Sequence, residues 1–139
     1  MMKTTWYGIR KREEKRMQID EGRLLNLKVK NVERGNLISK DWCKRTIKRL
    51  VDATNMKAIS QPMCVVYYDK ENSENDGVSG VVIISTSHIS LHAWLENKAI
   101  DITVNSCKDF STSKVIEFCK EEFFTEDVFI NVDVNKGGN

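Results

Sequence analysis

The 139-residue sequence has a single proline, two histidines and four cysteines, and no apolar run approaches the length of a membrane span. Its cysteines form no CxxC pair, so neither a zinc ribbon nor a disulfide framework is indicated, and we expect free thiols in a reducing compartment. Lysine and arginine interrupt the N-terminus, which therefore lacks the continuous apolar segment of a signal peptide. With 40% hydrophobic residues, the sequence predicts one compact, soluble, cytoplasmic domain.

Charge is unevenly distributed along the chain, although the net charge is only +2. Residues 1–58 carry 16 basic and 7 acidic side chains, whereas residues 59–139 carry 6 and 13. Basic side chains on the outer face of a helix are ordinarily solvated, and an acidic second half offers them partners within the chain or across a dimer. No RNA-binding signature or zinc-finger spacing accompanies the charge, so the sequence argues against a nucleic-acid partner, and a non-catalytic binding protein stays an alternative.

Hydrophobic periodicity predicts six strands and two helices. The strands are expected at residues 24–30, 63–68, 78–85, 88–94, 99–104 and 127–134. Ser39 is placed to cap a helix over residues 40–54, and Ser111 or Thr112 is placed to start a helix that ends near residue 124. The order βαβ, ββ, βαβ predicts an α+β fold, a two-layer α/β sandwich with a mainly antiparallel sheet and helices on one face.

The most informative segment is Gly77–Glu96, GVSGVVIISTSHISLHAWLE, which contains both histidines. Residues 78–85 form a short apolar, β-branched run of the kind that is buried on both faces. Apolar and polar residues alternate after it, so one face of the next strand is polar and aromatic. This row contains His88, Ser90, His92 and Trp94, with Glu96 in phase just beyond.

The two histidines are candidate metal ligands. His88 and His92 are four residues apart, a spacing that on a helix would place both on one face, with Cys107 or Asp101 completing a zinc site. Strict alternation favours a strand instead, and no glutamate lies between the histidines as in a zincin. We therefore predict no metal. Composition alone also allows a histidine at the edge of the core and a buried, inert Cys107.

The segment Gly77–Glu96 resembles the core of the bacterial and archaeal S-adenosylmethionine decarboxylase proenzymes, pyruvoyl enzymes with the pattern GVSGVVxISESHxxxHTWPE. A weaker similarity lies at Gly22–Glu33, GRLLNLKVKNVE, against the opening strand of that family, GRHLxADxxxCD. The resemblance covers roughly residues 22–134. It implies a decarboxylase-like domain at residues 22–139, preceded by a polar N-terminal extension at residues 1–21.

In that family the proenzyme cuts its own backbone before a serine, and the serine becomes the pyruvoyl cofactor at the start of the new chain. The resemblance implies self-cleavage between Thr86 and Ser87. It further implies that Ser79 stabilises the oxyanion and that His92 removes the Cα proton in the elimination that follows. The pyruvoyl ketone made from Ser87 then forms a Schiff base with the amine of a small-molecule substrate and accepts the electrons released with its carboxylate.

Other residues match the family's positions for catalysis and binding. Cys107 is the implied proton donor to the carbanion, because it lies as far from Glu96 as the family's cysteine lies from the matching glutamate. Aligning residues 99–104 on their AID sequence instead shifts the register by two residues and leaves this role open. Trp94 and Glu96 match positions near the adenosyl group, and a carboxylate suits two ribose hydroxyls.

The sequence departs from the family pattern in three places. Leu24 and Lys28 replace a histidine and an acidic residue, Thr86 replaces the glutamate before the cleavage serine, and the loop at residues 71–76 lacks an aromatic residue. The favoured function is a self-processing S-adenosylmethionine decarboxylase that supplies the aminopropyl donor for spermidine synthesis and forms a homodimer. A lysine does not favour a cationic sulfonium, so a pyruvoyl-dependent arginine or ornithine decarboxylase is an alternative, as is an unprocessed, non-catalytic homologue.

Overall fold

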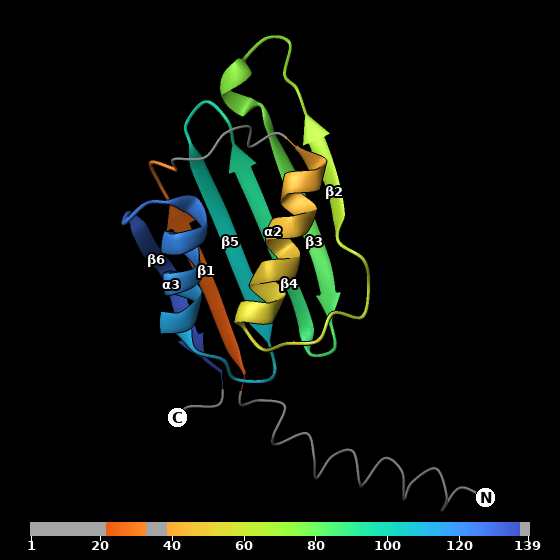
Figure 1. The fold of residues 1–139 in the computed structure, drawn as a ribbon, viewed down its shortest axis with the longest axis vertical. Coiled ribbons are helices and arrows are strands. Elements are labelled where there is room, and N and C mark those ends of the chain that lie inside the picture. Colours follow the sequence, from red (N-terminus) through yellow and green to blue (C-terminus); the bar gives the residue numbers. More distant parts are fainter. Residues whose placement is uncertain (1–21, 33–38, 137–139) are drawn as a thin grey trace, which may run out of the picture.

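The computed structural model describes residues 22–32 and 39–136 (Figure 1). The elements in chain order are β1 (Arg23–Val29), α2 (Lys40–Ala53), β2 (Met63–Tyr67), a short 3-10 helix η1 (Ser73–Asn75), β3 (Gly77–Ile84), β4 (Ser87–Trp94), β5 (Ala99–Ser106), α3 (Thr112–Phe123) and β6 (Val128–Asn135). The expected N-terminal extension, residues 1–21, lies outside the described residues.

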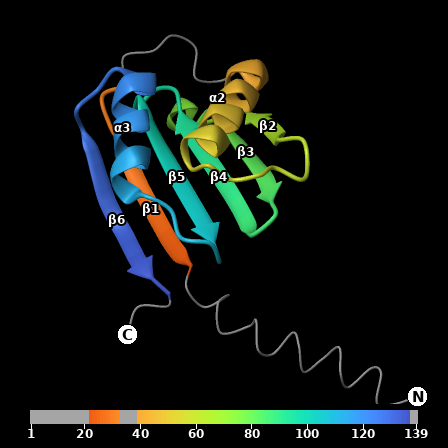
Figure 2. The ribbon, with the colours of Figure 1, turned by 60° about the horizontal axis from the view of Figure 1, so that its bottom comes forward.

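The six strands form one antiparallel sheet in the order β2-β3-β4-β5-β1-β6. Helices α2 and α3 lie side by side on the same face of the sheet (Figures 1 and 2). This arrangement confirms the predicted two-layer α+β sandwich, in which each helix buries its apolar stripe against the sheet. The opposite face, called the open face below, carries neither of these helices. Neither is long and apolar enough to cross a membrane.

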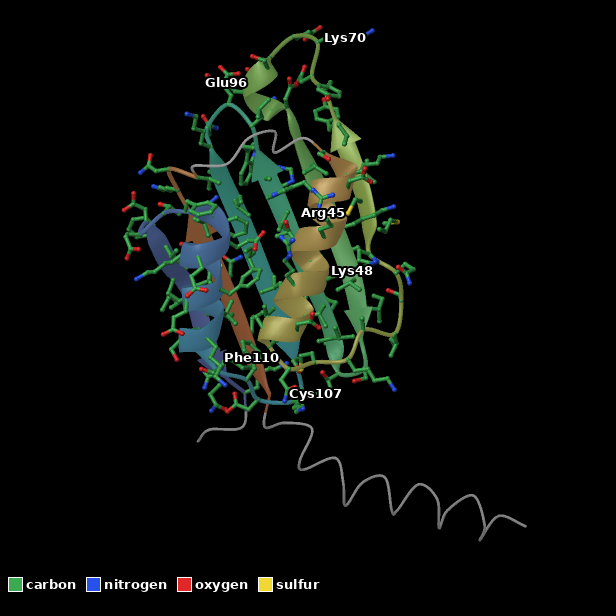
Figure 3. All side chains as sticks on the ribbon, viewed as in Figure 1. Arg45, Lys48, Lys70, Glu96, Cys107 and Phe110 are labelled. Atoms are coloured by element: carbon green, nitrogen blue, oxygen red, sulfur yellow. The ribbon has the colours of Figure 1, made fainter. Side chains whose placement is uncertain are left out.

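Helix α2 carries five of the sixteen basic residues in the positive first half of the sequence. It begins after Ser39, whose Oγ accepts a hydrogen bond from the Trp42 N–H at 3.1 Å. Basic side chains, including Arg45 and Lys48, occupy its solvent side (Figure 3). Arg49 pairs with Glu122 of α3 at 2.9 Å. The basic residues of α2 therefore form a solvated face that the acidic second half partly neutralises. The buried side of the helix carries Trp42, Cys43, Thr46, Ile47, Leu50 and Val51.

The β3–β4 hairpin has one buried face and one open face. Val82 and Ile84 of β3 are buried against the helix layer, whereas Ile83 is 46% exposed on the open face. The prediction that residues 78–85 are buried on both faces is therefore wrong for the single chain, because nothing described in this chain covers the second face. The alternation predicted for β4 is confirmed, since its apolar side chains are buried: Ile89, Leu91 and Ala93.

Gly80 allows α2 to lie close to β3. A Cβ atom at this position would lie 2.5 Å from Cys43 Sγ and 2.5 Å from Ile47 Cδ1, both on α2, and 2.9 Å from Cys64 Sγ on β2. These distances are well inside van der Waals contact, and a packed interior has no free volume to accept the extra group. The second glycine of the GVSG motif, Gly80, thus has a packing role.

We predict that Gly80→Ala destabilises the fold by about 1–3 kcal/mol, because α2 must move away from the sheet to admit the methyl group. Urea unfolding followed by circular dichroism measures the change. A matched control is Ser90→Ala on the open face of β4, which should alter the free energy of unfolding by less than about 0.5 kcal/mol. A Gly80→Ala protein as stable as the wild type would contradict the close packing described above.

Candidate active site

A two-residue turn, Ser85–Thr86, joins β3 to β4 and makes Ser87 the first residue of β4. Ser87 has a φ of 155°, a backbone conformation that residues other than glycine rarely adopt. Holding a side-chain-bearing residue in such a conformation costs about 1–3 kcal/mol, and residues of this kind cluster at functional sites. The strained residue is the serine before which the sequence predicts cleavage.

The carbonyl oxygen of Thr86 accepts two hydrogen bonds from Cys107. The Cys107 backbone N–H donates at 3.0 Å and its Sγ–H donates at 3.1 Å. Both donors polarise the carbonyl that the Ser87 hydroxyl would attack, and they are placed to stabilise negative charge on its oxygen. The structure therefore brings Cys107 to the Thr86–Ser87 linkage, whichever way residues 99–104 are aligned. We call Thr86, Ser87 and Cys107 the cleavage group.

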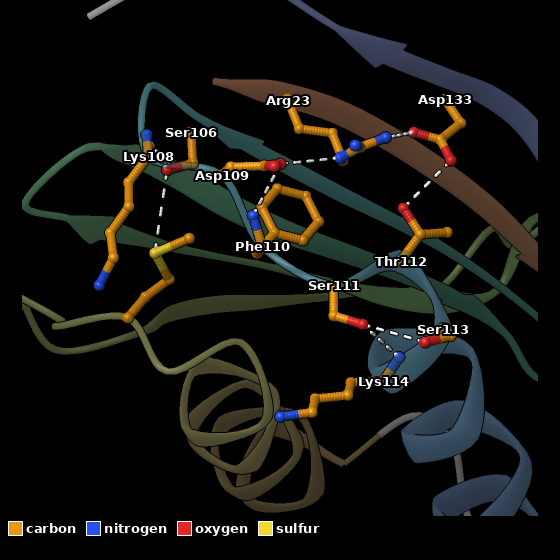
Figure 4. A network of polar contacts seen from close by, with 11 residues as sticks. Arg23, Ser106, Lys108, Asp109, Phe110, Ser111, Thr112, Ser113, Lys114 and Asp133 are labelled. Carbon is orange, nitrogen blue, oxygen red and sulfur yellow. Dashed lines mark hydrogen bonds and ion pairs between the residues drawn. The ribbon is translucent and has the colours of Figure 1, made fainter. Parts of the chain in front are cut away.

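Two residues that sequence reasoning missed hold the Thr86 side chain. Thr86 Oγ1 lies 2.7 Å from Ser106 Oγ, and both hydroxyls lie 3.8 Å from Met56 Sδ. Ser106 is fully buried and accepts the Lys108 N–H at 3.0 Å (Figure 4). A neutral threonine suits this enclosure, where a carboxylate would lose solvation. The only sequence signal for Ser106 is its position directly before Cys107.

Arg23 of β1 fixes the loop that follows Cys107 (Figure 4). Its guanidinium pairs with Asp133 of β6 at 2.5 Å and with Asp109 of the loop at 3.0 Å. Thr112 Oγ1 donates to the same Asp133 at 3.1 Å. The hydrogen bonds to Asp133 and Asp109 raise the pKa of Arg23, and Arg23 lowers the pKa of Asp109. This network ties β1, β6 and the Cys107 loop together.

A second polar group lies midway along the open face. Ser79 of β3 and His92 of β4 are directly opposite in the strand register, and Ser79 Oγ lies 2.5 Å from His92 Nδ1. The His92 ring packs edge-on against Trp94 with 4.2 Å between ring centres. Lys28 Nζ lies 4.4 Å from the centre of the Trp94 ring and 3.7 Å from a carboxylate oxygen of Asp101. We call Ser79 and His92 the histidine pair.

The histidine pair borders a hollow of about 370 Å³ on the open face. The hollow is also lined by Asp101 of β5 and by the exposed apolar side chains of Met63 and Val65 on β2. Such a mixture of apolar walls and a few converging polar groups is typical of small-molecule sites.

Burial lowers the pKa of His92 below its ordinary value of 6.5, and of the two nearby charges Asp101 raises it and Lys28 lowers it. His92 is therefore neutral at pH 7 and able to accept a proton. This state suits the base that the resemblance implies.

We predict that the imidazole of His92 titrates below pH 6.5 in the intact chain. Lys28→Met should move its midpoint upward, because a cation that opposes protonation is removed, and Asp101→Asn should move it downward. NMR titration of the Ser87→Ala chain, in which the expected cleavage is blocked, measures the midpoints. A midpoint at or above 6.5, or one that Lys28→Met leaves unchanged, would contradict these electrostatics.

The single chain does not bring the cleavage group and the histidine pair together. Ser87 and His92 both lie on β4, five residues apart, which corresponds to roughly 17 Å along a strand. An odd spacing in a strand also directs side chains to opposite faces. His92 therefore cannot reach the Ser87 hydroxyl of its own chain.

Glu96 lies still farther from the cleavage group. Figure 3 shows Glu96 and Cys107 at opposite ends of the molecule. The Glu96 carboxylate accepts a hydrogen bond from Ser73 Oγ of η1 at 2.7 Å. Trp94 and Glu96 thus lie on the side of the histidine pair, away from the turn.

The imidazole beside Ser87 belongs to His88, which the sequence analysis considered as a metal ligand or as a histidine at the edge of the core. Ser87 Oγ lies 3.2 Å from His88 Nδ1. The two histidines therefore contact two different serines. Within residues 22–32 and 39–136, no three histidine, cysteine, aspartate or glutamate side chains gather as metal ligands.

All four cysteines are free thiols, but only one is accessible. Cys43, Cys64 and Cys119 are buried, and Cys107 is partly exposed. Burial raises the pKa of Cys43, and it raises the pKa of Cys119 to about 12. The reactive position among the thiols is therefore Cys107, in the cleavage group.

The sequence is similar to one known protein family and to several curated proteins. The sequence model of the S-adenosylmethionine decarboxylase family matches residues 24–134. A Clostridium botulinum (strain Langeland) protein named S-adenosylmethionine decarboxylase proenzyme is 40% identical over 55 residues, 39% of this chain and 47% of that protein. A protein of the same name from Pyrococcus horikoshii is 40% identical over 48 residues, which are 34% of this chain and 34% of that protein. Another, from Archaeoglobus fulgidus, is 44% identical over 39 residues, which are 28% of this chain and 33% of that protein. The alignments thus span about half the length, or less, of these curated relatives.

Proposed function

Because the chain belongs to the S-adenosylmethionine decarboxylase family, we propose that it is a self-processing, pyruvoyl-dependent decarboxylase of S-adenosylmethionine that acts in the cytoplasm. Its product would serve as the aminopropyl donor in spermidine synthesis. The observation that carries the proposal is the pair of Cys107 hydrogen bonds to the Thr86 carbonyl, beside a strained Ser87.

The cleavage group fits a pyruvoyl group made from Ser87. The Ser87 hydroxyl is adjacent to the Thr86 carbonyl, the carbonyl oxygen has two donors, and the Thr86 side chain is fixed by Ser106. A pyruvoyl group supplies an electrophilic carbonyl for the amine of the substrate and a sink for the electrons that the departing carboxylate leaves. Cys107 would hold the proton at Sγ that the substrate carbon then takes up.

The separation within one chain supports a homodimer with shared sites. The open face leaves large apolar side chains exposed, including Met63 at 64%, Val65 at 55% and Ile83 at 46%. A patch of this kind marks an interaction surface. If two copies pack their open faces with the strands running in opposite directions, the turn end of one sheet lies over the middle of the other.

We assign the roles across this interface. Ser87 and Cys107 of one copy meet the histidine pair of the other, where Ser79 assists the oxyanion and His92 removes the Cα proton. Trp94 and Glu96 lie on the same side as the histidine pair and would bind the adenosyl group through ring stacking and hydrogen bonds to the ribose. Each site then contains groups that one chain alone keeps far apart.

The arginine or ornithine alternative is not favoured. It was raised by Leu24 and Lys28, and the charge of Lys28 would repel a sulfonium. Lys28 pairs with Asp101 and lies over the Trp94 ring, so its charge is balanced within the chain. The family match also runs through both positions that depart from the pattern on the opening strand, Leu24 and Lys28.

We predict that the purified protein consists of two chains, residues 1–86 and a fragment that starts at residue 87 with a blocked N-terminus. Ser87→Ala should remain one chain, because no hydroxyl is available to attack the Thr86 carbonyl. Ser85→Ala, which removes an exposed hydroxyl from the same turn, is the matched control and should be cleaved normally. Intact-mass analysis measures all three proteins.

A wild-type chain that stays whole on prolonged incubation would contradict processing and would leave the non-catalytic homologue. For the cleaved protein, release of labelled carbon dioxide from S-adenosylmethionine, arginine and ornithine identifies the substrate. We expect release from S-adenosylmethionine, and release from a basic amino acid alone would restore the alternative.

Shared sites predict complementation between two inactive precursors. Ser87→Ala and His92→Ala chains should each remain whole when expressed alone. When they are co-expressed, the His92→Ala chain should be cleaved, because the Ser87→Ala copy supplies an intact histidine pair. Mass analysis distinguishes the two chains. A His92→Ala chain that stays whole in the mixture would show that His92 acts only within its own chain.

A further inference from the structure

We propose that His88 is the base that takes the proton from the Ser87 hydroxyl when the Thr86–Ser87 peptide bond is converted into an ester. The inference rests on the proposed self-processing and names a residue for its first step. His88 Nδ1 lies 3.2 Å from Ser87 Oγ, whereas His92 lies five residues from Ser87 along β4 and is hydrogen-bonded to Ser79.

For His88 to act as the base, the Ser87 hydroxyl must donate the hydrogen bond and His88 Nδ1 must accept it. For the hydroxyl to donate, Nδ1 of His88 must be unprotonated, and the ring proton then lies on Nε2. In this tautomer Nδ1 is the acceptor for the proton that must leave when Oγ becomes a nucleophile. An acceptor at 3.2 Å is close to hydrogen-bonding distance before any movement, and catalytic contacts of this kind tighten as the reaction proceeds.

The carbonyl of the Thr86–Ser87 bond also has hydrogen-bond donors in place. The Thr86 oxygen accepts the backbone N–H and the thiol of Cys107 at 3.0 and 3.1 Å. A nucleophile with its base therefore lies beside a carbonyl with its oxyanion donors. Ser87 starts from a strained φ of 155°, which the loss of its planar amide link to Thr86 relieves.

The conversion of the peptide bond into an ester needs only Thr86, Ser87 and His88. The Oγ proton moves to His88 Nδ1 as the bond from Oγ to the Thr86 carbonyl carbon forms. The carbon–nitrogen bond then breaks, and the same proton passes from Nδ1 to the Ser87 nitrogen. The products are an ester between Thr86 and the Ser87 side chain and a free Ser87 amine, with no oxidant, reductant or co-reactant. His92 of the second copy acts only afterwards, on the Cα proton.

The test follows cleavage of the full-length chain, synthesised in vitro, by intact mass with and without hydroxylamine. Hydroxylamine cuts an ester but leaves a peptide bond intact, so it separates the two steps. His88→Ala should slow cleavage by at least about 100-fold and should leave the chain whole in hydroxylamine, because the ester does not form. His92→Ala should stay whole without hydroxylamine and be cut with it.

His88→Gln distinguishes a base from a residue that only positions the hydroxyl. Glutamine keeps a hydrogen-bond acceptor but cannot carry the proton, so it should be as slow as His88→Ala. It also provides a second variant should the alanine chain fail to fold, and circular dichroism checks both.

Three results would overturn the role of His88: cleavage of His88→Ala at the wild-type rate, accumulation of a hydroxylamine-sensitive ester in that variant, or normal cleavage of His88→Gln. A wild-type chain that is never cleaved overturns the proposed function itself, and the role of His88 with it. That outcome is distinct from the other three, in which the wild type matures.

Discussion

The contact between Cys107 and the Thr86 carbonyl is the constraint on which the chemistry depends. Strands β4 and β5 pair along their whole length, from Ser87 opposite Ser106 to Trp94 opposite Ala99. The Cys107 N–H bond to the Thr86 oxygen continues this pairing by one step beyond the strand ends. The Thr86 carbonyl, at which cleavage is proposed, is therefore positioned by the sheet, and a rigid support is what directed attack requires.

The sheet also explains why two serine–histidine contacts occur at two places. Cross-strand register sets Ser79 against His92 on the open face, whereas the tight turn sets Ser87 against His88 at the end of the hairpin. The extended backbone of β4 keeps Ser87 and His92, five residues apart, from approaching each other within one chain. The proposed dimer would bring them together by placing a second sheet on the open face, where apolar side chains are exposed.

Much of the fold could be predicted from the sequence. Period-two and helical patterns located the strands and helices, and Ser39 marked the start of α2, because these signals depend on local residue type. The burial of β3 was predicted wrongly, because β-branched residues indicate a strand but not whether its own chain covers both faces. The contact between Ser79 and His92 joins residues 13 positions apart and depends on a register that only the turn sets.

The candidate site could be predicted only in part, because its contacts also depend on strand register and not on local residue type. Ser87 and Cys107 could be named by resemblance, but their meeting across β4 and β5 is a property of the sheet. The position of His88 beside Ser87 depends on a backbone angle that no residue pattern encodes, and Ser106 and Met56 carry no chemical signature of their own. The sequence therefore singled out the candidate serine, whereas the residues that contact it became evident only from the structure.

Whether Ser87 becomes a pyruvoyl group is measured by mass spectrometry of the peptide that begins at residue 87, before and after reduction with borodeuteride. Conversion of Ser87 into a pyruvoyl group predicts a blocked peptide lighter than the serine form by the mass of ammonia, which takes up one deuterium on reduction of its ketone. A peptide that begins with unmodified serine, or an uninterrupted peptide across Thr86 and Ser87, would contradict the account.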